Sequence, residues 1–183
     1  MPSVLRYAPG DARALVDYNR AIFERFVRRI RRLPTKDVMR DRGIGHGSLF
    51  DTLVHVLHVQ EVWLVYIVRG RNSDRELGDL FGDAGRRPTT WKEFDAYAER
   101  VWTGVEATAR GWTPRSLGQR VKAFWMPGQY TVRDALMQAT VEEAHHLGEI
   151  IGALWKDDLS SPDMTWIDVR RPGTAKPRTR KPG

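Results

Sequence analysis

Apolar residues recur every three or four positions in four long segments of the chain, separated by polar or Pro/Gly-containing stretches. This spacing is typical of helices that bury one face. The second segment is apolar on most of its circumference, as expected for a helix with several packing neighbours. The pattern therefore predicts an all-α fold with helices over Asp11 to Leu33, Ser48 to Arg69, Thr90 to about Arg110, and Thr131 to Trp155.

Three of these helices begin with a hydroxyl residue that is followed, three positions later, by a carboxylate. The pairs are Ser48 with Asp51, Thr90 with Glu93, and Thr131 with Asp134. In such a capping box the hydroxyl accepts a hydrogen bond from an unpaired amide, and the carboxylate binds the amide of the cap residue. We extend the usual Glu or Gln of this motif to Asp.

The connections between the helices differ in length and composition. Residues 35–47 read as a loop with three Gly, in which His46 has no recognisable partner. Residues 70–88 are polar, Gly-rich and long enough for a crossover that returns the chain to the starting end of a four-helix bundle. Residues 120–130 form a short β-like run broken by Pro-Gly, which predicts a small β-hairpin or an extended loop before the last helix.

A helical wheel divides the last helix into three sectors. The broad apolar face, which we expect in the core, holds Leu136, Met137, Thr140, Val141, Leu147, Gly148, Ile151 and Leu154. A narrow stripe with Asp134, Gln138, His145 and Glu149 is expected to face solvent. The third sector is apolar or small, with Ala135, Ala139, Ile150 and Ala153, and its ionisable residues are Glu142 and His146.

Glu142 and His146 are candidate metal ligands, because residues four apart lie one above the other on a helix. A carboxylate and an imidazole in an otherwise apolar groove suit a divalent cation, which supplies the compensating charge. The same pair could instead form a hydrogen bond in a helix interface. His55, on the polar side of the second predicted helix, could face solvent or a wet internal site.

Composition favours a globular protein. With 183 residues and 41% hydrophobic residues, the chain can bury a sizeable core in one domain. We find no apolar run that could span a bilayer and no secretory leader, and therefore expect a cytoplasmic protein with no membrane contact. The absence of Cys excludes disulfides, thiolate metal sites and a cysteine nucleophile.

The net charge of +7 is concentrated at the C-terminus. Residues 170–183 carry six Lys/Arg and no acid, so 7 − 6 leaves +1 for the rest. We therefore expect two regions: a domain over residues 1–169 and a disordered basic Pro/Gly-rich tail over residues 170–183. Nucleic acid is not an expected partner beyond nonspecific contact through this tail.

The order of helices and motifs resembles the DinB/YfiT-like superfamily over roughly residues 10 to 156. In the second segment, Ser48-Leu-Phe-Asp-Thr-Leu-Val-His55 looks like the family's first ligand helix. In the fourth, Tyr130-Thr131-Val132-Arg133-Asp134 and then Glu142-x-x-x-His146-Leu-Gly-Glu-Ile look like the segment that usually reads His-x-x-x-His-Arg-Gly-Gln. The resemblance implies a DinB-like four-helix bundle.

Carried over by position, the family's metal ligands fall on His55, Glu142 and His146. Most relatives have His where this chain has Glu142. Two His and one carboxylate remain a competent ligand set for a divalent Zn, Ni, Fe or Mn ion. The resemblance also turns His55 inward, toward the bundle.

The resemblance further implies a metalloprotein that is often dimeric. Its characterised relatives include thiol-dependent S-transferases and a mycothiol-dependent maleylpyruvate isomerase. Our first hypothesis is therefore a metal-dependent transferase or isomerase that acts on a small electrophilic substrate with a low-molecular-weight thiol as cosubstrate. The alternative is a noncatalytic metal- or ligand-binding helical bundle with a stress-related role.

Overall fold

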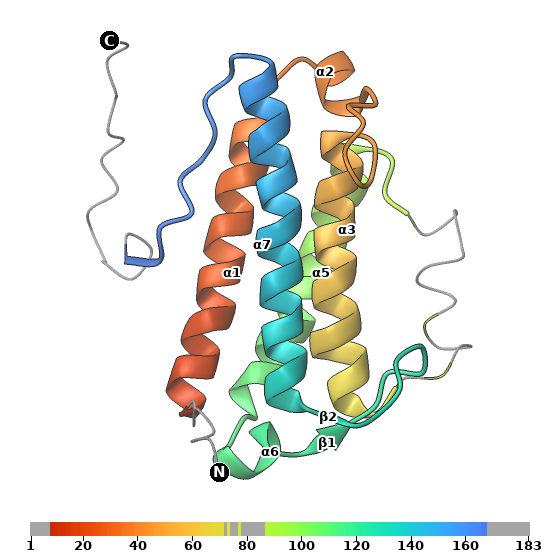
Figure 1. Ribbon diagram of the computed structural model, residues 1–183, viewed down its shortest axis with the longest axis vertical. Coiled ribbons are helices and arrows are strands. Elements are labelled where there is room, and N and C mark those ends of the chain that lie inside the picture. The colour runs from red at the N-terminus through yellow and green to blue at the C-terminus, as the bar shows by residue number, and fades with distance from the viewer. Residues whose placement is uncertain (1–7, 72, 74–76, 78–86, 168–183) are drawn as a thin grey trace.

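The computed structural model describes residues 8–71, 73, 77 and 87–167. Within these residues, four long helices form the bundle: α1 (Pro9–Ile30), α3 (Leu49–Glu61), α5 (Trp91–Arg110) and α7 (Val132–Lys156). Figure 1 shows that α1 and α7 run in one direction along the bundle, whereas α3 and α5 run in the other. The predicted all-α four-helix bundle is thus confirmed.

The long connection after α3 is a crossover, as predicted. Because α3 and α5 are parallel neighbours, the chain must return along the length of the bundle between them (Figure 1). Contacts along the two helices follow this parallel register, since Phe50 meets Trp91 near one end and Arg69 meets Thr108 near the other. Most of the crossover, like the basic tail after residue 167, lies outside the described residues.

The helix starts follow the predicted caps. Ser48 accepts from the amide of Asp51 before α3, and Thr90 and Thr131 form reciprocal capping boxes with Glu93 and Asp134 before α5 and α7. Each cap satisfies amides that would otherwise lack a partner in the first helical turn. These caps explain why three of the predicted starts agree with the structure to within one residue.

Several short elements complete the fold. The predicted hairpin exists as strands β1 (Arg120–Val121) and β2 (Tyr130–Thr131), which pair antiparallel with Arg120 opposite Thr131. Residues 35–47, expected to be a loop, begin with a short helix, α2 (Thr35–Met39). A second short helix, α6 (Pro114–Leu117), follows α5. None of the helices among the described residues is long and apolar enough to cross a membrane.

The second predicted helix changes its winding partway. After α3, the chain continues as a π-helical turn, η1 (Val62–Tyr66), and a 3₁₀ turn, η2 (Ile67–Arg69), which ends at Gly70 with a φ of 75°. A π-helical turn widens a helix locally and is frequent at functional sites. This irregularity comes directly after the buried residue Glu61.

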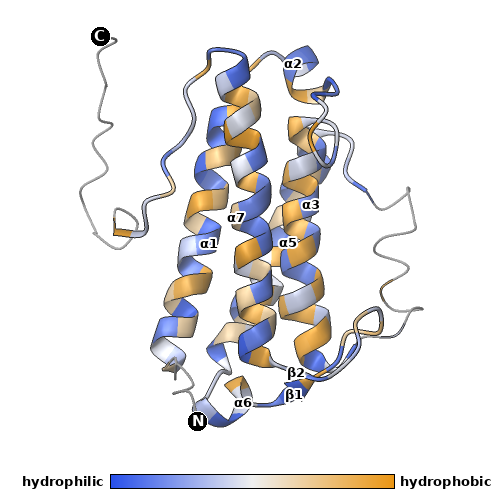
Figure 2. Cartoon of the chain, in the orientation of Figure 1, coloured by the Kyte–Doolittle hydropathy of each residue, from blue (hydrophilic) through white to orange (hydrophobic). Residues whose placement is uncertain are grey.

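The core lies along the bundle axis, where apolar residues of the four helices meet (Figure 2). Phe23 of α1, Phe50 of α3 and Phe94 of α5 are buried and pack their rings at centroid distances of 5.6 to 6.1 Å. Aromatic side chains bury more area than other residues, so this cluster contributes a large part of the hydrophobic stabilisation. It joins three of the four long helices.

The buried face of α7 agrees with the predicted one in part. Leu136, Leu147 and Leu154 are buried as predicted, but Val141, assigned to the core, is 58% exposed, and Gly148 is also exposed. The small-residue sector, including Ala139 and Ile150, is buried as well. Small side chains allow α7 to approach its neighbours closely. The number of apolar residues on a face therefore does not by itself show which face of the helix is buried.

The core encloses a carboxyl group, that of Glu143 on α7, which is 3% exposed. Nε2 of Gln60 on α3 donates to Glu143 Oε2 at 2.7 Å and to the carbonyl of Ala139 at 3.3 Å. Burial raises the pKa of Glu143 well above its usual range, although the Gln60 hydrogen bond opposes this. The other polar atom of the same amide, Gln60 Oε1, is buried without a hydrogen-bond partner among the described residues.

Replacing this carboxyl should change how stability depends on pH. Because the folded pKa of Glu143 is raised, its contribution is fully present below the unfolded pKa of about 4.3 and is lost as pH rises toward the folded pKa. Glu143→Gln should remove this loss, which amounts to at most about 1.4 kcal/mol per pH unit. Urea unfolding of wild type and variant at pH 4.5 to 8 measures it. The exposed Glu99→Gln is the matched control, and parallel pH curves for wild type and Glu143→Gln would contradict the prediction.

Candidate metal centre

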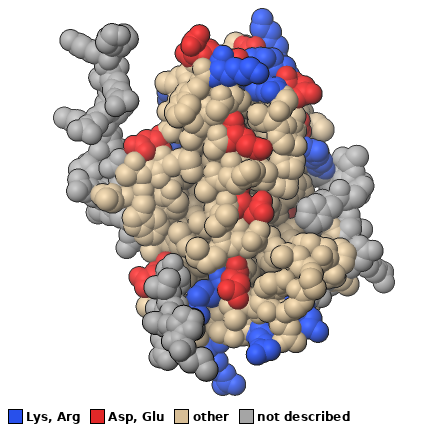
Figure 3. All heavy atoms as spheres, viewed as in Figure 1, with Lys and Arg blue, Asp and Glu red and all other residues tan. Residues whose placement is uncertain are grey.

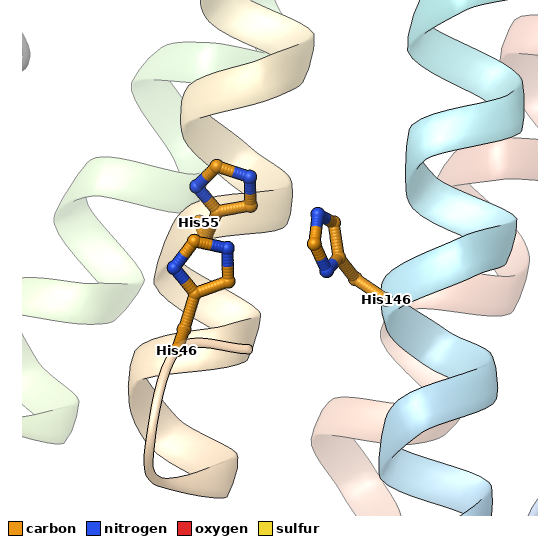
Figure 4. A group of neighbouring side chains, drawn as sticks. All are labelled: His46, His55 and His146. Atoms are coloured by element: carbon orange, nitrogen blue, oxygen red, sulfur yellow. The ribbon is translucent and has the colours of Figure 1, made fainter. Parts of the chain in front are cut away.

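Three histidines from separate parts of the chain meet between α3 and α7 (Figure 4). His55 extends from α3, His146 from α7, and His46 from the loop before α3 (Figure 4). Each offers a ring nitrogen, and these ligand atoms lie within 4.8 Å of one another. The rings of His46 and His55 stack with centroids 3.6 Å apart, and His146 approaches both edge-on.

The structure brings together two of the predicted ligands directly. His55 is half-buried and faces α7, so the inward orientation implied by the resemblance is found. His146 is 7% exposed and lies on the inner side of α7. The two helices are antiparallel neighbours, which is why residues far apart in sequence can meet here.

Glu142, the third predicted ligand, lies one helical turn before His146 on α7. Its Oε2 is 3.4 Å from Nε2 of His146, and its Oε1 accepts from Nε2 of Gln138 at 2.7 Å. The carboxylate therefore lies beside His146 and is held by Gln138 on the same helix, but the group of ligand atoms within 4.8 Å of one another contains the three imidazoles and not Glu142. The residue that sequence reasoning missed in this cluster is His46.

His46 is positioned by a tightly connected loop. Gly43 and Gly47 have φ values of 65° and 81°, a region that residues with a Cβ rarely adopt. Arg42 anchors the loop, because its buried guanidinium donates to the Asp37 carbonyl at 2.8 Å and pairs with Asp157 at the end of α7. These contacts hold His46 over the first turns of α3.

Glu149 lies next to the cluster and was wrongly assigned to a solvent-facing stripe. Its Oε2 is 2.8 Å from Nδ1 of His146, and its Oε1 accepts from the amide of Gly45 at 3.3 Å. A Cβ on Gly45 would lie 2.9 Å from Glu149 Oε1, so only Gly allows this approach without a shift. Glu149 thus connects the His46 loop to His146.

The orientation of the His146 ring follows from these contacts. Because Glu149 occupies Nδ1, the ring is oriented with Nε2 toward Glu142 and the other imidazoles. Partial burial opposes ionisation of Glu149, but the His146 hydrogen bond and the Gly45 amide lower the pKa of its carboxyl on balance. A carboxylate on the outer nitrogen of a histidine is the usual arrangement behind a metal ligand.

The other two imidazoles are neutral near pH 7. Burial, followed by the charges of His46 and His146, lowers the pKa of His55 to about 3. Burial and the proximity of His146 also lower the pKa of His46. Neutral imidazoles are the form that binds metal ions, so no proton has to be displaced from His55 at neutral pH.

A second group of candidate ligands lies on α7 itself. His145, His146 and Glu149 also bring ligand atoms within 4.8 Å of one another, but the side chain of His145 is 64% exposed. Its exposure agrees with the expectation that His145 faces solvent. Both groups share His146, and they differ in whether the ion would bridge two helices.

The surface around the site carries charges of both signs. On the face seen in Figure 3, Lys and Arg gather toward the ends of the bundle, and acidic side chains lie both at its upper end and along its middle. The basic tail, to which nonspecific nucleic-acid contact was assigned, lies outside the described residues.

Comparison with known proteins identifies the family. The profile of the DinB superfamily matches residues 20–150, which include His46, His55, Glu142 and His146. No curated protein matches the chain. The chain belongs to the DinB superfamily, and its His cluster can bind a divalent metal ion.

Single substitutions should distinguish the two groups of ligands. His146→Ala removes a member of both groups, so it should abolish stoichiometric metal binding. His55→Ala should do the same if the ion bridges α3 and α7, whereas His145→Ala should leave the metal content unchanged. Metal per protein, measured by elemental analysis of folded variants, decides between them. Retention in His55→Ala together with loss in His145→Ala would place the ion on α7 alone.

The hydrogen bond from Glu149 should support metal affinity without contributing a ligand. Removing an outer-shell carboxylate from a histidine ligand typically weakens binding by 10- to 100-fold. We expect about that loss for Glu149→Gln in a competition titration with a chromogenic chelator. Exposed Glu99→Gln on α5 should bind as the wild type does. Wild-type affinity in Glu149→Gln would contradict the assignment.

Proposed function

We propose that this protein is a metal-dependent enzyme that joins a low-molecular-weight thiol to a small electrophilic substrate, as a transferase or isomerase. The observation that carries the proposal is the convergence of three imidazoles at the junction of α3, α7 and the loop before α3, with Glu142 3.4 Å from one of them, His146. The ion would be held by His46, His55 and His146, with Glu142 as a further ligand from α7.

The residues present fit a divalent ion. In a tetrahedral zinc site with bonds of about 2.1 Å, two ligand atoms are about 3.4 Å apart. Glu142 Oε2 and His146 Nε2 are 3.4 Å apart, and the imidazole atoms lie within 4.8 Å of one another. Nitrogen and carboxylate donors suit Zn, Ni, Fe or Mn ions.

The arrangement suits chemistry better than a purely structural role. Structural zinc sites usually contain thiolates, which this chain lacks. His46 and His55 are only partly buried, so a small molecule can approach the imidazoles from solvent. Three imidazoles with an accessible side are typical of catalytic sites.

A bound divalent ion would lower the pKa of a coordinated water or thiol and so supply a nucleophile near neutral pH. The protein residues would set the geometry around it. His146 is oriented by Glu149, and Glu142 is held by Gln138. Because the chain contains no Cys, the reacting sulfur would come from the cosubstrate.

The proposal predicts that metal binding and thiol chemistry depend on the same residues. The protein, purified without a His-tag, should contain about one divalent ion per chain, and a chelator should lower its melting temperature by removing the ligand of the folded state. It should also consume thiol in the presence of a small electrophile, measured as loss of free thiol. His55→Ala and His146→Ala should lose both properties.

Glu142 provides the sharper part of this test. Glu142→Ala should weaken metal binding, whereas Glu142→His, which restores the commoner residue of the family, should retain it. The exposed His145→Ala is the control for both measurements. Stoichiometric metal without turnover of any thiol in a broad panel would favour the noncatalytic alternative, and absence of metal binding would refute the proposal.

A further inference from the structure

Arg87 is held in place by the segment that leads into α5. Pro88, directly after it, is buried. The amides of Thr89 and Thr90 both donate to Oε2 of Glu93, at 2.8 and 3.1 Å. These contacts belong to the cap of α5, so the cap also fixes the chain at Arg87.

The side chain of Arg87 reaches across to α3. The parallel helices α3 and α5 begin at the same end of the bundle, where Phe50 contacts Trp91. Nη2 of Arg87 donates to Oδ1 of Asp51 at 2.9 Å. The hydroxyl of Ser48 donates to the other oxygen, Oδ2, at 2.6 Å. Asp51 is therefore held from both sides and orients the guanidinium of Arg87.

Asp51 places this guanidinium next to His55. The two residues are four apart on α3, so their side chains lie on one face, about 5.4 Å apart along the helix axis. Burial is the main cause that lowers the pKa of His46 and of His55, and the charges of neighbouring imidazoles and of Arg87 add to it. Arg87 thus lies within electrostatic range of two of the proposed metal ligands.

The guanidinium of Arg87 is accessible to a ligand. Its side chain is 46% exposed, and the contact with Asp51 uses Nη2. A guanidinium has five N–H donors and can bind a carboxylate through two of them, so donors remain for a ligand. An ion pair between exposed side chains contributes little to stability, so Arg87 can be replaced without unfolding the protein.

We propose that Arg87 determines the specificity of the His-cluster site by binding the carboxylate of a small molecule whose other end contacts the metal ion. This inference rests on the proposed function and names its substrate class, a small carboxylic acid. Because one helical turn separates Asp51 from His55, a molecule a few atoms long can contact both Arg87 and the ion. The carboxylates of Asp51, Glu142 and Glu149 around the site disfavour a group of higher negative charge.

Two pairs of ligands, each a carboxylate and its neutral amide, test the charge requirement by calorimetric titration of the zinc-loaded protein. We expect 3-mercaptopropionate to bind at least about tenfold more tightly than 3-mercaptopropanamide, because a hydrogen bond between charged groups is lost in the amide. Propanoate should likewise bind more tightly than propanamide. Equal affinities within both pairs, or no binding of any of the four at millimolar concentration, would overturn the proposal.

The sulfur-free pair separates this proposal from the thiol chemistry. Preference for propanoate in a protein that binds no thiol would support the role of Arg87 and refute the proposed use of a thiol. Thiol binding with equal affinities in both pairs would do the reverse. A protein that takes up no zinc would refute both.

A substitution makes the test specific to Arg87. Arg87→Gln should weaken binding of each carboxylate about tenfold and leave the amides unchanged. The matched control is Arg28→Gln on α1, which also removes an exposed arginine next to a carboxylate, that of Glu24, and should bind as the wild type does. A carboxylate that contacted only the zinc ion would keep its preference in Arg87→Gln, and this result would overturn the proposal. Equal weakening of carboxylate and amide would show a structural role and would also contradict it.

The carboxylate has two sources, the thiol or the electrophile, and the same titrations separate them. If the thiol carries it, 3-mercaptopropionate joins both contacts in one molecule and should bind at least about tenfold more tightly than propanoate or 2-mercaptoethanol. If the electrophile carries it, propanoate should bind equally well with and without saturating 2-mercaptoethanol. Either result supports the proposal. Competition between propanoate and 2-mercaptoethanol, with no gain for 3-mercaptopropionate, would contradict it, because both would then bind the ion alone.

Discussion

The packing of α3 against α7 determines the distances within the metal centre. These helices are antiparallel, and the buried contact of Gln60 with Glu143 lies about one turn from the His cluster on the same interface. An amide that spans the interface fixes both the separation and the register of the helices, since a slide along the axis would leave buried polar atoms unpaired. His55 and His146 are held opposite each other because that register is fixed.

The loop before α3 depends on the same interface. Arg42 and Gly45 connect it to the end of α7 through Asp157 and Glu149. His46 is thereby placed above two helices that are already in register. An ion bound to His46, His55 and His146 would cross-link three segments that are distant in sequence, which is why its binding should be coupled to folding.

Local sequence signals predicted the helix starts, the crossover and the hairpin because their causes are local. A cap such as Thr131 with Asp134 acts within one helical turn, so its effect can be read from four residues. The buried face of α7 was predicted only in part, because burial depends on which neighbours the helix packs against. Val141 is apolar but exposed, whereas Glu143 is charged in its usual state but buried. Tertiary contacts decided both.

His46 and Glu149 were missed for a related reason. A loop histidine has no periodicity to connect it with a helix, and Glu149 looked like part of a polar stripe until the loop covered it. A usable signal was present in the glycines at positions 43, 45 and 47 around His46. Two of them adopt positive φ and the third permits close contact with Glu149, so their spacing marked a loop with a demanding conformation.

Two neighbouring faces of α3 carry different polar groups. His55 and His58 are three residues apart, so they diverge by about 60° around the helix axis, one toward α7 and the other toward α5. A regular helix can present both, but the π-helical turn after Glu61 shifts the helical phase and turns Val65 and Tyr66 toward the α5 side.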